Sequence, residues 1–154
     1  MKELIAHLIG DYVLQSHWQA TEKVKKSFAC LVHVLLYGVP FYFIGASWTA
    51  LFVIVSTHFL IDRFRLAKYV CYAKQFIAPK STLFNDWTNY DCSCGICNFC
   101  NGQQERLLKT EFSWQNCKDT GFPSETPPFL AVWLLIIVDN TMHLCINFLA
   151  LRYL

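Results

Sequence analysis

Long apolar runs separated by short polar breaks dominate the chain and predict its helices. The run at 129–151 is interrupted mainly by one acid, one histidine and two asparagines. About 20 apolar residues suffice for a helix to cross a bilayer. A second apolar block, at 28–61, is broken at 45–47 and predicts two short helices, 28–45 and 48–62, joined by a tight hairpin. We expect all three helices to span a membrane.

The first segment, 4–20, is apolar on one side and polar on the other. It predicts either a short spanning helix or a helix lying in the membrane interface. We favour a span, because the polar side can be sealed against the other helices. A cleaved signal peptide is not expected, since His7 and Asp11 interrupt the apolar run and no small-residue cleavage site follows. The predicted fold class is all-α, a polytopic integral membrane bundle of about four transmembrane helices with a cysteine-rich cytoplasmic loop.

Composition supports a single membrane domain over 1–154. Charged residues make up 16% of the chain and hydrophobic residues 55%, whereas about a quarter of an ordinary soluble domain is charged. A small soluble domain has too little interior to hide so much apolar surface. The net charge of +2 gives no field that would attract nucleic acid, so we expect none as a partner. The partner that composition predicts is the lipid bilayer.

The distribution of basic residues predicts the orientation. With four spans, the 20–27 loop and the long 63–128 segment share one side, and that side holds most of the lysines and arginines. Basic loops face the cytoplasm, so we expect a cytoplasmic long loop and external termini, with the N-terminus inside if the first helix lies only in the interface. Within the long segment, 65–78 alternates basic and apolar residues. It predicts a helix on the lipid headgroups or, equally, an extension of the third helix.

Five cysteines lie in the inserted loop at 79–127. They are Cys92, Cys94, Cys97, Cys100 and Cys117. The adjoining C-x-x-C pairs aim thiolates at a tetrahedral ion, and a reducing cytoplasm disfavours disulfides. We therefore predict structural zinc, with an iron–sulfur cluster or a metal-free loop as alternatives. The loop is also the predicted docking point for a protein partner.

The predicted spans carry three pairs of histidine and aspartate, each pair four residues apart. They are His7 with Asp11, His58 with Asp62, and Asp139 with His143. Positions i and i+4 share one face of a helix, and ionisable groups at membrane depth cost several kcal/mol unless they are paired. We therefore expect the pairs, with His33, Gln15 and Asn140, to converge on one internal site. The alternative is a hydrogen-bonded network that only holds the bundle together.

Depth along each helix, at about 1.5 Å per residue, predicts a ladder of polar groups instead of one ring. Asp11 and Asp139 lie midway, His7 and His143 deeper, and Asp62 near the surface. Such a ladder suits a cleft with one or two metal positions, or an ion path.

Imidazole and carboxylate together suit Zn²⁺, Mn²⁺ or Fe²⁺, and the ion's identity stays open. The predicted ligands are His7, Asp11, His33, His58, Asp62, Asp139 and His143. An open coordination position would make the site hydrolytic, and an aspartate that is not a ligand could act as general base. The predicted catalytic residues are Asp11, Asp139 and His143.

These motifs resemble those of a known family. The opening HLIGDYVLQ, the lone His33, the HFLID at 58–62 and the DNTMH at 139–143 resemble a family of small bacterial and phage membrane proteins of unknown function. The chain is more distantly similar to the YdjM-type family called membrane-bound metal-dependent hydrolases. The resemblance implies a bacterial or phage origin, and with it a bacterial inner-membrane location, and the same His/Asp site, with Gln15 included.

The leading functional hypothesis is a metal-dependent membrane hydrolase. Its site opens to the cytoplasm, and its substrate would be a lipid or a phosphorylated or acylated small molecule. One alternative is a non-enzymatic membrane protein whose zinc loop binds a partner. Another is an ion or metal carrier, in which oligomerisation would supply the pathway.

Overall fold

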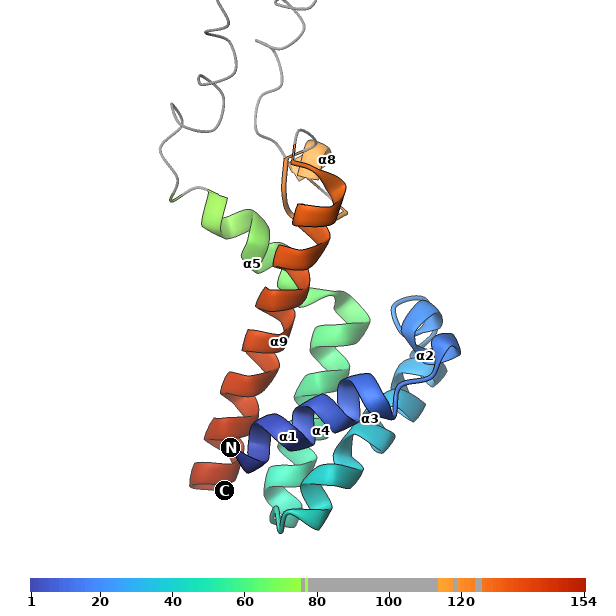
Figure 1. Cartoon of the computed structure of the whole chain (residues 1–154), viewed down its shortest axis with the longest axis vertical. Coiled ribbons are helices and arrows are strands. Elements are labelled where there is room, and N and C mark those ends of the chain that lie inside the picture. Colours follow the sequence, from blue (N-terminus) through green and yellow to red (C-terminus); the bar gives the residue numbers. More distant parts are fainter. Residues whose placement is uncertain (76, 78–113, 118, 124–125) are drawn as a thin grey trace, which may run out of the picture.

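The computed structural model describes residues 1–75, 77, 114–117, 119–123 and 126–154, and every regular element in these residues is helical. Figure 1 shows a bundle with the two termini at one end and α5 and α8 at the other. In chain order the elements are α1 (Lys2–Leu8), η1 (Ile9–Val13), α2 (His17–Glu22), α3 (Ser27–Phe43), α4 (Trp48–Phe64), α5 (Leu66–Gln75), α8 (Trp114–Cys117) and α9 (Pro128–Tyr153).

Helices α3 and α4 form an antiparallel hairpin where the sequence predicts helices over 28–45 and 48–62. Gly45 has a φ of +88° in the connecting turn, a conformation that glycine adopts without steric cost. The Ser47 hydroxyl then accepts a hydrogen bond from the amide of Ala50 at 3.0 Å and caps the start of α4. Each helix has 17 residues, about 25 Å at 1.5 Å per residue.

Helix α9 is the one described helix that is both long enough and apolar enough to cross a membrane. Its 26 residues extend about 39 Å, and Pro128 at its first turn is a position that proline favours. A helix of this kind can also form the core of a soluble protein, where it is mostly buried. Here only 11% of its most apolar window is buried inside the molecule. The described helices therefore provide one candidate span instead of the four predicted, with α3 as a shorter apolar helix.

The segment at 4–20 is not one continuous helix. α1 passes into the π-helical turn η1, which ends at Val13, and α2 begins after Ser16. Ser16 and Gln19 form a capping box: the Ser16 amide donates to Gln19 Oε1 at 2.7 Å, and the Gln19 amide donates to Ser16 Oγ at 3.3 Å. This reciprocal pair starts a new helix, and the sequence analysis did not take it into account.

α5 is a separate helix and not an extension of α4. Arg65, between them, has a left-handed backbone with a φ of 49°, and this ends the α-helical course of the chain. α5 then packs against α9. Of the two interpretations of 65–78, the continuous extension is therefore wrong.

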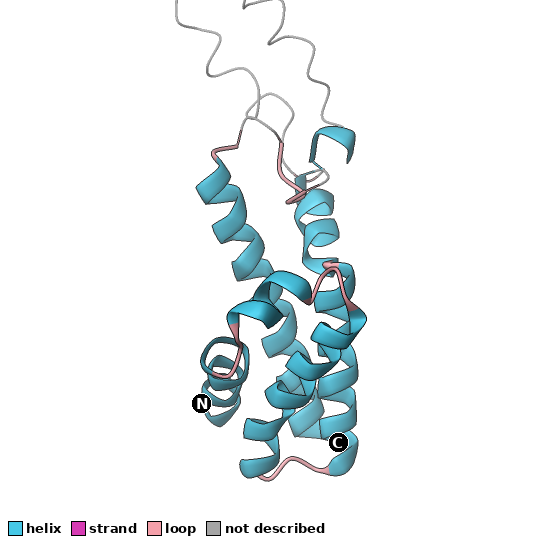
Figure 2. Ribbon diagram, turned by 90° about the vertical axis from the view of Figure 1, so that its right-hand side faces the viewer, coloured by secondary structure: helices cyan, strands magenta, loops and turns pink. Residues whose placement is uncertain are grey.

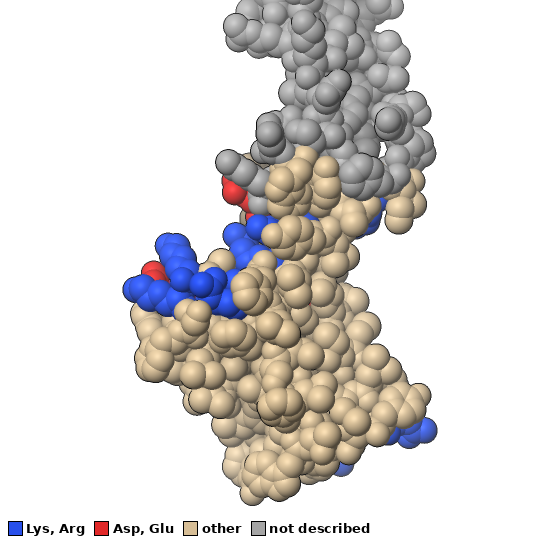
Figure 3. Space-filling model, turned by 180° about the vertical axis from the view of Figure 1, so that it is seen from behind, with Lys and Arg blue, Asp and Glu red and all other residues tan. Residues whose placement is uncertain are grey.

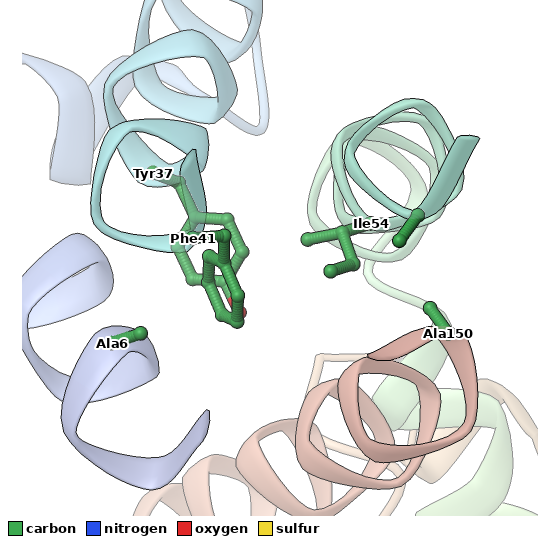
Figure 4. Packing of buried hydrophobic residues seen from close by; sticks show 6 residues of the cluster. Ala6, Tyr37, Phe41, Ile54 and Ala150 are labelled. Carbon is green, nitrogen blue, oxygen red and sulfur yellow. The ribbon is translucent and has the colours of Figure 1, made fainter. Parts of the chain in front are cut away.

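The apolar core lies near the end of the bundle that holds the termini. Figure 4 shows Ala6, Tyr37, Phe41, Ile54 and Ala150 pointing toward one another from α1, α3, α4 and α9. Figure 2, turned by 90°, shows the same helices side by side. This core joins α1, the α3–α4 hairpin and α9, which are distant in sequence. It thereby fixes how the polar faces of these helices meet next to the core.

The surface divides into an apolar body and a basic end. Figure 3 shows the visible Lys and Arg side chains gathered mainly at one level, with a few more at the far end. Large apolar side chains are exposed on the body, among them Phe43 at 79%, Trp48 at 78% and Phe52 at 73%. At the basic end, Arg63 donates hydrogen bonds to Val24 O at 2.6 Å and Ser27 Oγ at 3.1 Å. The start of α3 is thereby held against the end of α4.

Candidate metal centre

Four helices bring the predicted polar residues together at the middle of the bundle. Asp11 comes from η1, His33 from α3, His58 and Asp62 from α4, and Asp139 and His143 from α9. All are buried except Asp139, which is partly exposed. The predicted convergence on one internal site therefore describes the position of these six residues.

The first group consists of one atom each from Asp11, His33, His58 and Asp62. These four atoms all lie within 4.8 Å of one another. His33 Nε2 is 3.1 Å from His58 Nε2 and 3.2 Å from both Asp11 Oδ1 and Asp62 Oδ2. His58 Nε2 is 3.2 Å from Asp62 Oδ2 and 3.9 Å from Asp11 Oδ1. Ligands about 2.0 Å from a tetrahedral zinc ion are separated by about 3.3 Å, so these atoms are spaced as a metal's ligands are.

The second group shares Asp62 with the first. His143 Nε2 lies 3.5 Å from Asp62 Oδ1 and 3.5 Å from Asp139 Oδ2. Asp62 therefore directs one carboxylate oxygen to each group, Oδ2 to the first and Oδ1 to the second. The sequence analysis predicted Asp62 to lie near the surface, but its side chain is 3% exposed at the centre of both groups.

Buried polar atoms without a hydrogen-bond partner are concentrated in these two groups. Within the described part of the chain, every such side-chain atom belongs to them: Asp11 Oδ1, Asp62 Oδ2, His143 Nε2 and the Nδ1 atoms of His33 and His58. Asp62 Oδ2 still has the Lys23 ammonium at 2.8 Å, and His143 Nε2 has a carboxylate oxygen of Asp62 and one of Asp139 at 3.5 Å, so these atoms have charged neighbours without a well-directed hydrogen bond. Bound cations would satisfy the two carboxylate oxygens and His143 Nε2, and the two Nδ1 atoms would need other partners.

Lys23 is a functional candidate that the sequence analysis used only for orientation. Its Nζ lies 2.8 Å from Asp62 Oδ2, 3.6 Å from Asp11 Oδ1 and 3.4 Å from His33 Nε2, and it donates to Gln15 Oε1 at 2.9 Å. Burial alone would lower the pKa of Lys23, but the attraction to Asp62 and Asp11 outweighs burial and raises it. Lys23 is therefore a cation beside three of the four atoms of the first group. No spacing rule could have found it, because it lies in the turn after α2.

His7 is the predicted ligand that belongs to neither group. Its Nε2 is 2.7 Å from Asn140 Oδ1 and its Nδ1 is 2.8 Å from the Tyr37 hydroxyl. An amide oxygen only accepts, so in a neutral ring Nε2 donates to Asn140 and Nδ1 accepts from Tyr37. Asn147 Nδ2 also donates to the Tyr37 hydroxyl, at 2.6 Å. Both ring nitrogens of His7 are thus engaged, and the residue acts as part of the network that surrounds the cluster.

Three stacked rings hold His58 in place. The Tyr37 ring stacks on the His58 ring with centroids 3.7 Å apart. The His143 ring also stacks on the His58 ring, with centroids 3.9 Å apart. The interplanar angles are 29° and 24°. This stacking restricts the imidazole orientation, which is the usual requirement for a preorganised ligand.

A cavity of about 540 Å³ reaches the cluster from the basic end. Its polar lining includes Asp11, Asp62 and Asp139 together with the cations Lys23, Lys25 and Arg65, and its apolar wall includes Leu135 and Ile136. Gln15 and Asn140 also line it. The three carboxylates are therefore accessible from outside, which a purely structural network would not require.

The predicted cysteine site lies mostly beyond the described residues, which exclude Cys92, Cys94, Cys97 and Cys100. Cys117 is described and buried at the end of α8. The prediction of structural zinc in the loop therefore stays a prediction.

Comparison with known proteins gives one family. The profile of a family described as "Protein of unknown function (DUF3307)" matches residues 1–85. No curated protein and no solved structure matches the chain. The match agrees with the predicted resemblance to a family of unknown function, while the similarity to YdjM-type hydrolases stays a prediction. Asp11, His33, His58 and Asp62 all lie within the matched residues, whereas Asp139 and His143 lie outside them.

Proposed function

We propose that this chain, which belongs to the DUF3307 family of proteins of unknown function, is a metal-dependent membrane hydrolase that cleaves phosphate esters. The observation that carries the proposal is the spacing of the four buried atoms of Asp11, His33, His58 and Asp62. Five of the six separations among these atoms are 3.1–3.9 Å and all lie within 4.8 Å, which fits the ligands of a divalent ion. Two imidazoles and two carboxylates are also the donor set that Zn²⁺, Mn²⁺ and Fe²⁺ accept.

The charges of the site support a divalent ion. Asp11, Asp62 and Asp139 carry three negative charges, and Lys23 supplies one positive charge against them. Histidines that bind a metal ion must be neutral, and in that state two negative charges remain for the ion to balance. A divalent cation balances them, and removing this imbalance matters most where water is excluded.

Membrane embedding is supported by the surface. α9 is long and apolar enough to span, and only 11% of its apolar window is buried. The exposed aromatic residues Phe43, Trp48 and Phe52 lie at or near the turn between α3 and α4. We propose that α3, α4 and α9 cross the bilayer with α1 and η1 oblique beside them. The 12 residues of α1 and η1 extend only about 18 Å, so they enter the bilayer without crossing its roughly 30 Å core.

The cavity lining supports an anionic, partly apolar substrate. Lys25 and Arg65 at its rim attract an anion, and Leu135 and Ile136 on its wall accommodate an apolar chain. A phosphorylated amphiphile offers both features. In the reaction, the oxygen of water bonds to phosphorus, the phosphorus–oxygen ester bond breaks, and a proton from the water ends on the departing alcohol oxygen. An ion held by Asp11, His33, His58 and Asp62 would polarise the phosphoryl oxygen and lower the pKa of the attacking water.

The test is metal-dependent phosphate release by the full chain purified in detergent and loaded with Mn²⁺. Phosphatidic acid in mixed micelles and 4-nitrophenyl phosphate in solution are the two substrates, and they distinguish a lipid from a soluble ester. We expect Asp62→Asn and His58→Ala to lose bound Mn²⁺ and to reduce phosphate release at least about 100-fold.

His17→Ala is the matched control, because His17 is exposed and belongs to neither group. It should keep both the ion and the activity. Absence of bound Mn²⁺ in the wild-type protein would overturn the proposal, as would full activity in Asp62→Asn. The two other hypotheses, a partner-binding zinc loop and an ion carrier, rest on no described contact and stay predictions.

A further inference from the structure

We infer that the site holds two ions bridged by the Asp62 carboxylate, the second ion being bound by Asp139 and His143. The inference rests on the proposed first ion and extends it to a dinuclear centre. Its starting point is that Asp62 presents a different oxygen to each group. Oδ2 faces His33 and His58 at 3.2 Å, while Oδ1 faces His143 at 3.5 Å. A carboxylate placed in this way can bind two cations at once, one on each oxygen.

The stacked histidines indicate how far apart the ions would lie. The rings of His58 and His143 are nearly parallel, at 24°, with centroids 3.9 Å apart. Each directs Nε2 toward a different oxygen of Asp62. Ions bound to two parallel imidazoles are separated by about the distance between the rings. That distance falls within the roughly 3.5–4 Å typical of hydrolytic two-metal sites.

The position of the buried His143 Nε2 also fits a ligand of the second ion, because it faces two carboxylate oxygens without forming a well-directed hydrogen bond to either. His143 is 2% exposed, and its Nε2 has no hydrogen-bond partner among the residues that the structure describes. It lies 3.5 Å from both Asp62 Oδ1 and Asp139 Oδ2. Those distances are close to the separation expected of ligands around one tetrahedral ion, about 3.3 Å.

The two positions differ in a way that assigns them different tasks. The first has four protein ligands, which is typical of a closed site. The second has three, which leaves room for water or substrate as in catalytic sites. Asp139 is partly exposed and lines the cavity, so the open side of the second position faces the route by which a substrate enters. We therefore place the reacting phosphate at the second ion, with the first ion holding Asp62 in position.

Two divalent ions would also change the charge of the site. Together they bring four positive charges, whereas three carboxylates and the Lys23 ammonium leave only two negative ones. The loaded site therefore becomes positive and favours an anionic substrate. A pair of ions can stabilise both the attacking and the leaving oxygen of a phosphoryl group. The dinuclear centre thus accounts for a phosphate ester as substrate more directly than one ion does.

The experiment is to count bound Mn²⁺ in the detergent-purified full chain and record its electron paramagnetic resonance spectrum. Mn²⁺ is chosen because carboxylate and imidazole bind it, whereas thiolates select softer ions, so the loop cysteines do not add to the count. We expect two ions per chain with an exchange-coupled spectrum in the wild-type protein. His143→Ala and the near-isosteric Asp139→Asn should each hold one ion with an uncoupled six-line spectrum, and His17→Ala should resemble the wild type.

The outcomes separate this inference from the proposed function. One uncoupled ion in the wild type, retained in both His143→Ala and Asp139→Asn, would overturn the second ion and leave the first intact. No bound ion in the wild type would overturn both. Retention of the coupled spectrum in Asp139→Asn and His143→Ala would also contradict the assignment of these two ligands. Asp139→Asn keeps the test decisive if His143→Ala fails to fold, because Asp139 is at the cavity edge and not in the packed interior.

Discussion

Lys23 is the residue whose position most affects how the cluster works. Its ammonium is 2.8 Å from Asp62 Oδ2 and 3.6 Å from Asp11 Oδ1, the same oxygens that face the proposed first ion. In the metal-free protein Lys23 therefore provides the positive charge that these carboxylates need. Once an ion is bound, the two cations repel each other across a short distance in a medium of low dielectric constant.

This double role predicts opposite effects of Lys23→Met. In chelator the variant leaves two buried carboxylates without their cation, so its stability should fall by about 3 kcal/mol. In Mn²⁺ the stability should return and the affinity for the ion should rise by about tenfold, because the competing charge is gone. Thermal unfolding in detergent, with and without Mn²⁺, measures both effects.

Lys25→Met is the control, since Lys25 is exposed and forms no ion pair with the cluster carboxylates in the described part of the chain. It should leave unfolding and Mn²⁺ affinity almost unchanged. If Mn²⁺ failed to restore the stability of Lys23→Met, the carboxylates would not be binding the ion in place of the ammonium.

At the scale of the element, the π-helical turn η1 determines where Asp11 points. π-helical turns are rare in proteins, but those that occur are often at functional sites. η1 crosses close to α3 at Gly10, where an added Cβ would lie 2.7 Å from Tyr37 Cδ2 and 3.0 Å from Tyr37 O. Only glycine permits this approach, and it brings Asp11 Oδ1 to 3.2 Å from His33 Nε2.

Gly10→Ala should therefore damage the site from outside it. The added methyl group meets α3 backbone, which cannot rotate away, so η1 must move and stability should fall by about 1–3 kcal/mol. Because Asp11 moves with η1, Mn²⁺ affinity should fall as well. Thermal unfolding and Mn²⁺ titration measure the two effects.

Gly38→Ala is the comparison within the same bundle. Its Cβ would meet only Val55 Cγ2, at 3.0 Å, and a side chain can adjust where a backbone cannot. It should keep the affinity for Mn²⁺. Equal loss of affinity in both variants would show that general loosening of the bundle, and not the position of Asp11, controls the ion.

At the scale of the whole molecule, an apolar body joins a basic end (Figure 3), and Lys25 and Arg65 also line the cavity. Figure 1 places both termini at the opposite end from α5 and α8. If basic residues face the cytoplasm, the cavity opens there and the C-terminus, at the far end of α9, lies outside. The substrate would then reach the ions at the cytoplasmic surface of the membrane, where lipid headgroups lie.

This orientation predicts the behaviour of reporter fusions at Leu154. Alkaline phosphatase, which folds only outside the cytoplasm, should be active there, and green fluorescent protein should be dark. The fusion protein should also stay with membranes through an alkaline wash. The reverse pattern of reporters would place the cavity mouth outside, and release by the wash would contradict membrane embedding altogether.

The sequence predicted much of the local structure because local structure depends on neighbouring residues. Apolar runs and the break at 45–47 placed the α3–α4 hairpin and α9, and the spacing of four residues placed each histidine on the same helical face as its aspartate. The same reasoning missed the break between η1 and α2, where the mutual hydrogen bonds of Ser16 and Gln19 start a new helix.

Which of these residues meet was decided by the tertiary structure alone. Depth along separate straight helices placed Asp62 at the surface and His7 deep in the site. The oblique course of α1 and η1, made possible by the contact of Gly10 with Tyr37, instead directs His7 to Asn140 and Tyr37. It also places Asp11 beside His33 and Asp62.

Lys23 reaches the cluster for a similar reason, because α2 turns the chain back over the end of the bundle. Residue type and periodicity thus identified the chemistry. Whether a given residue is a candidate ligand, part of the surrounding network or a neighbouring cation depends on contacts between segments far apart in the chain. No local sequence pattern encodes such contacts.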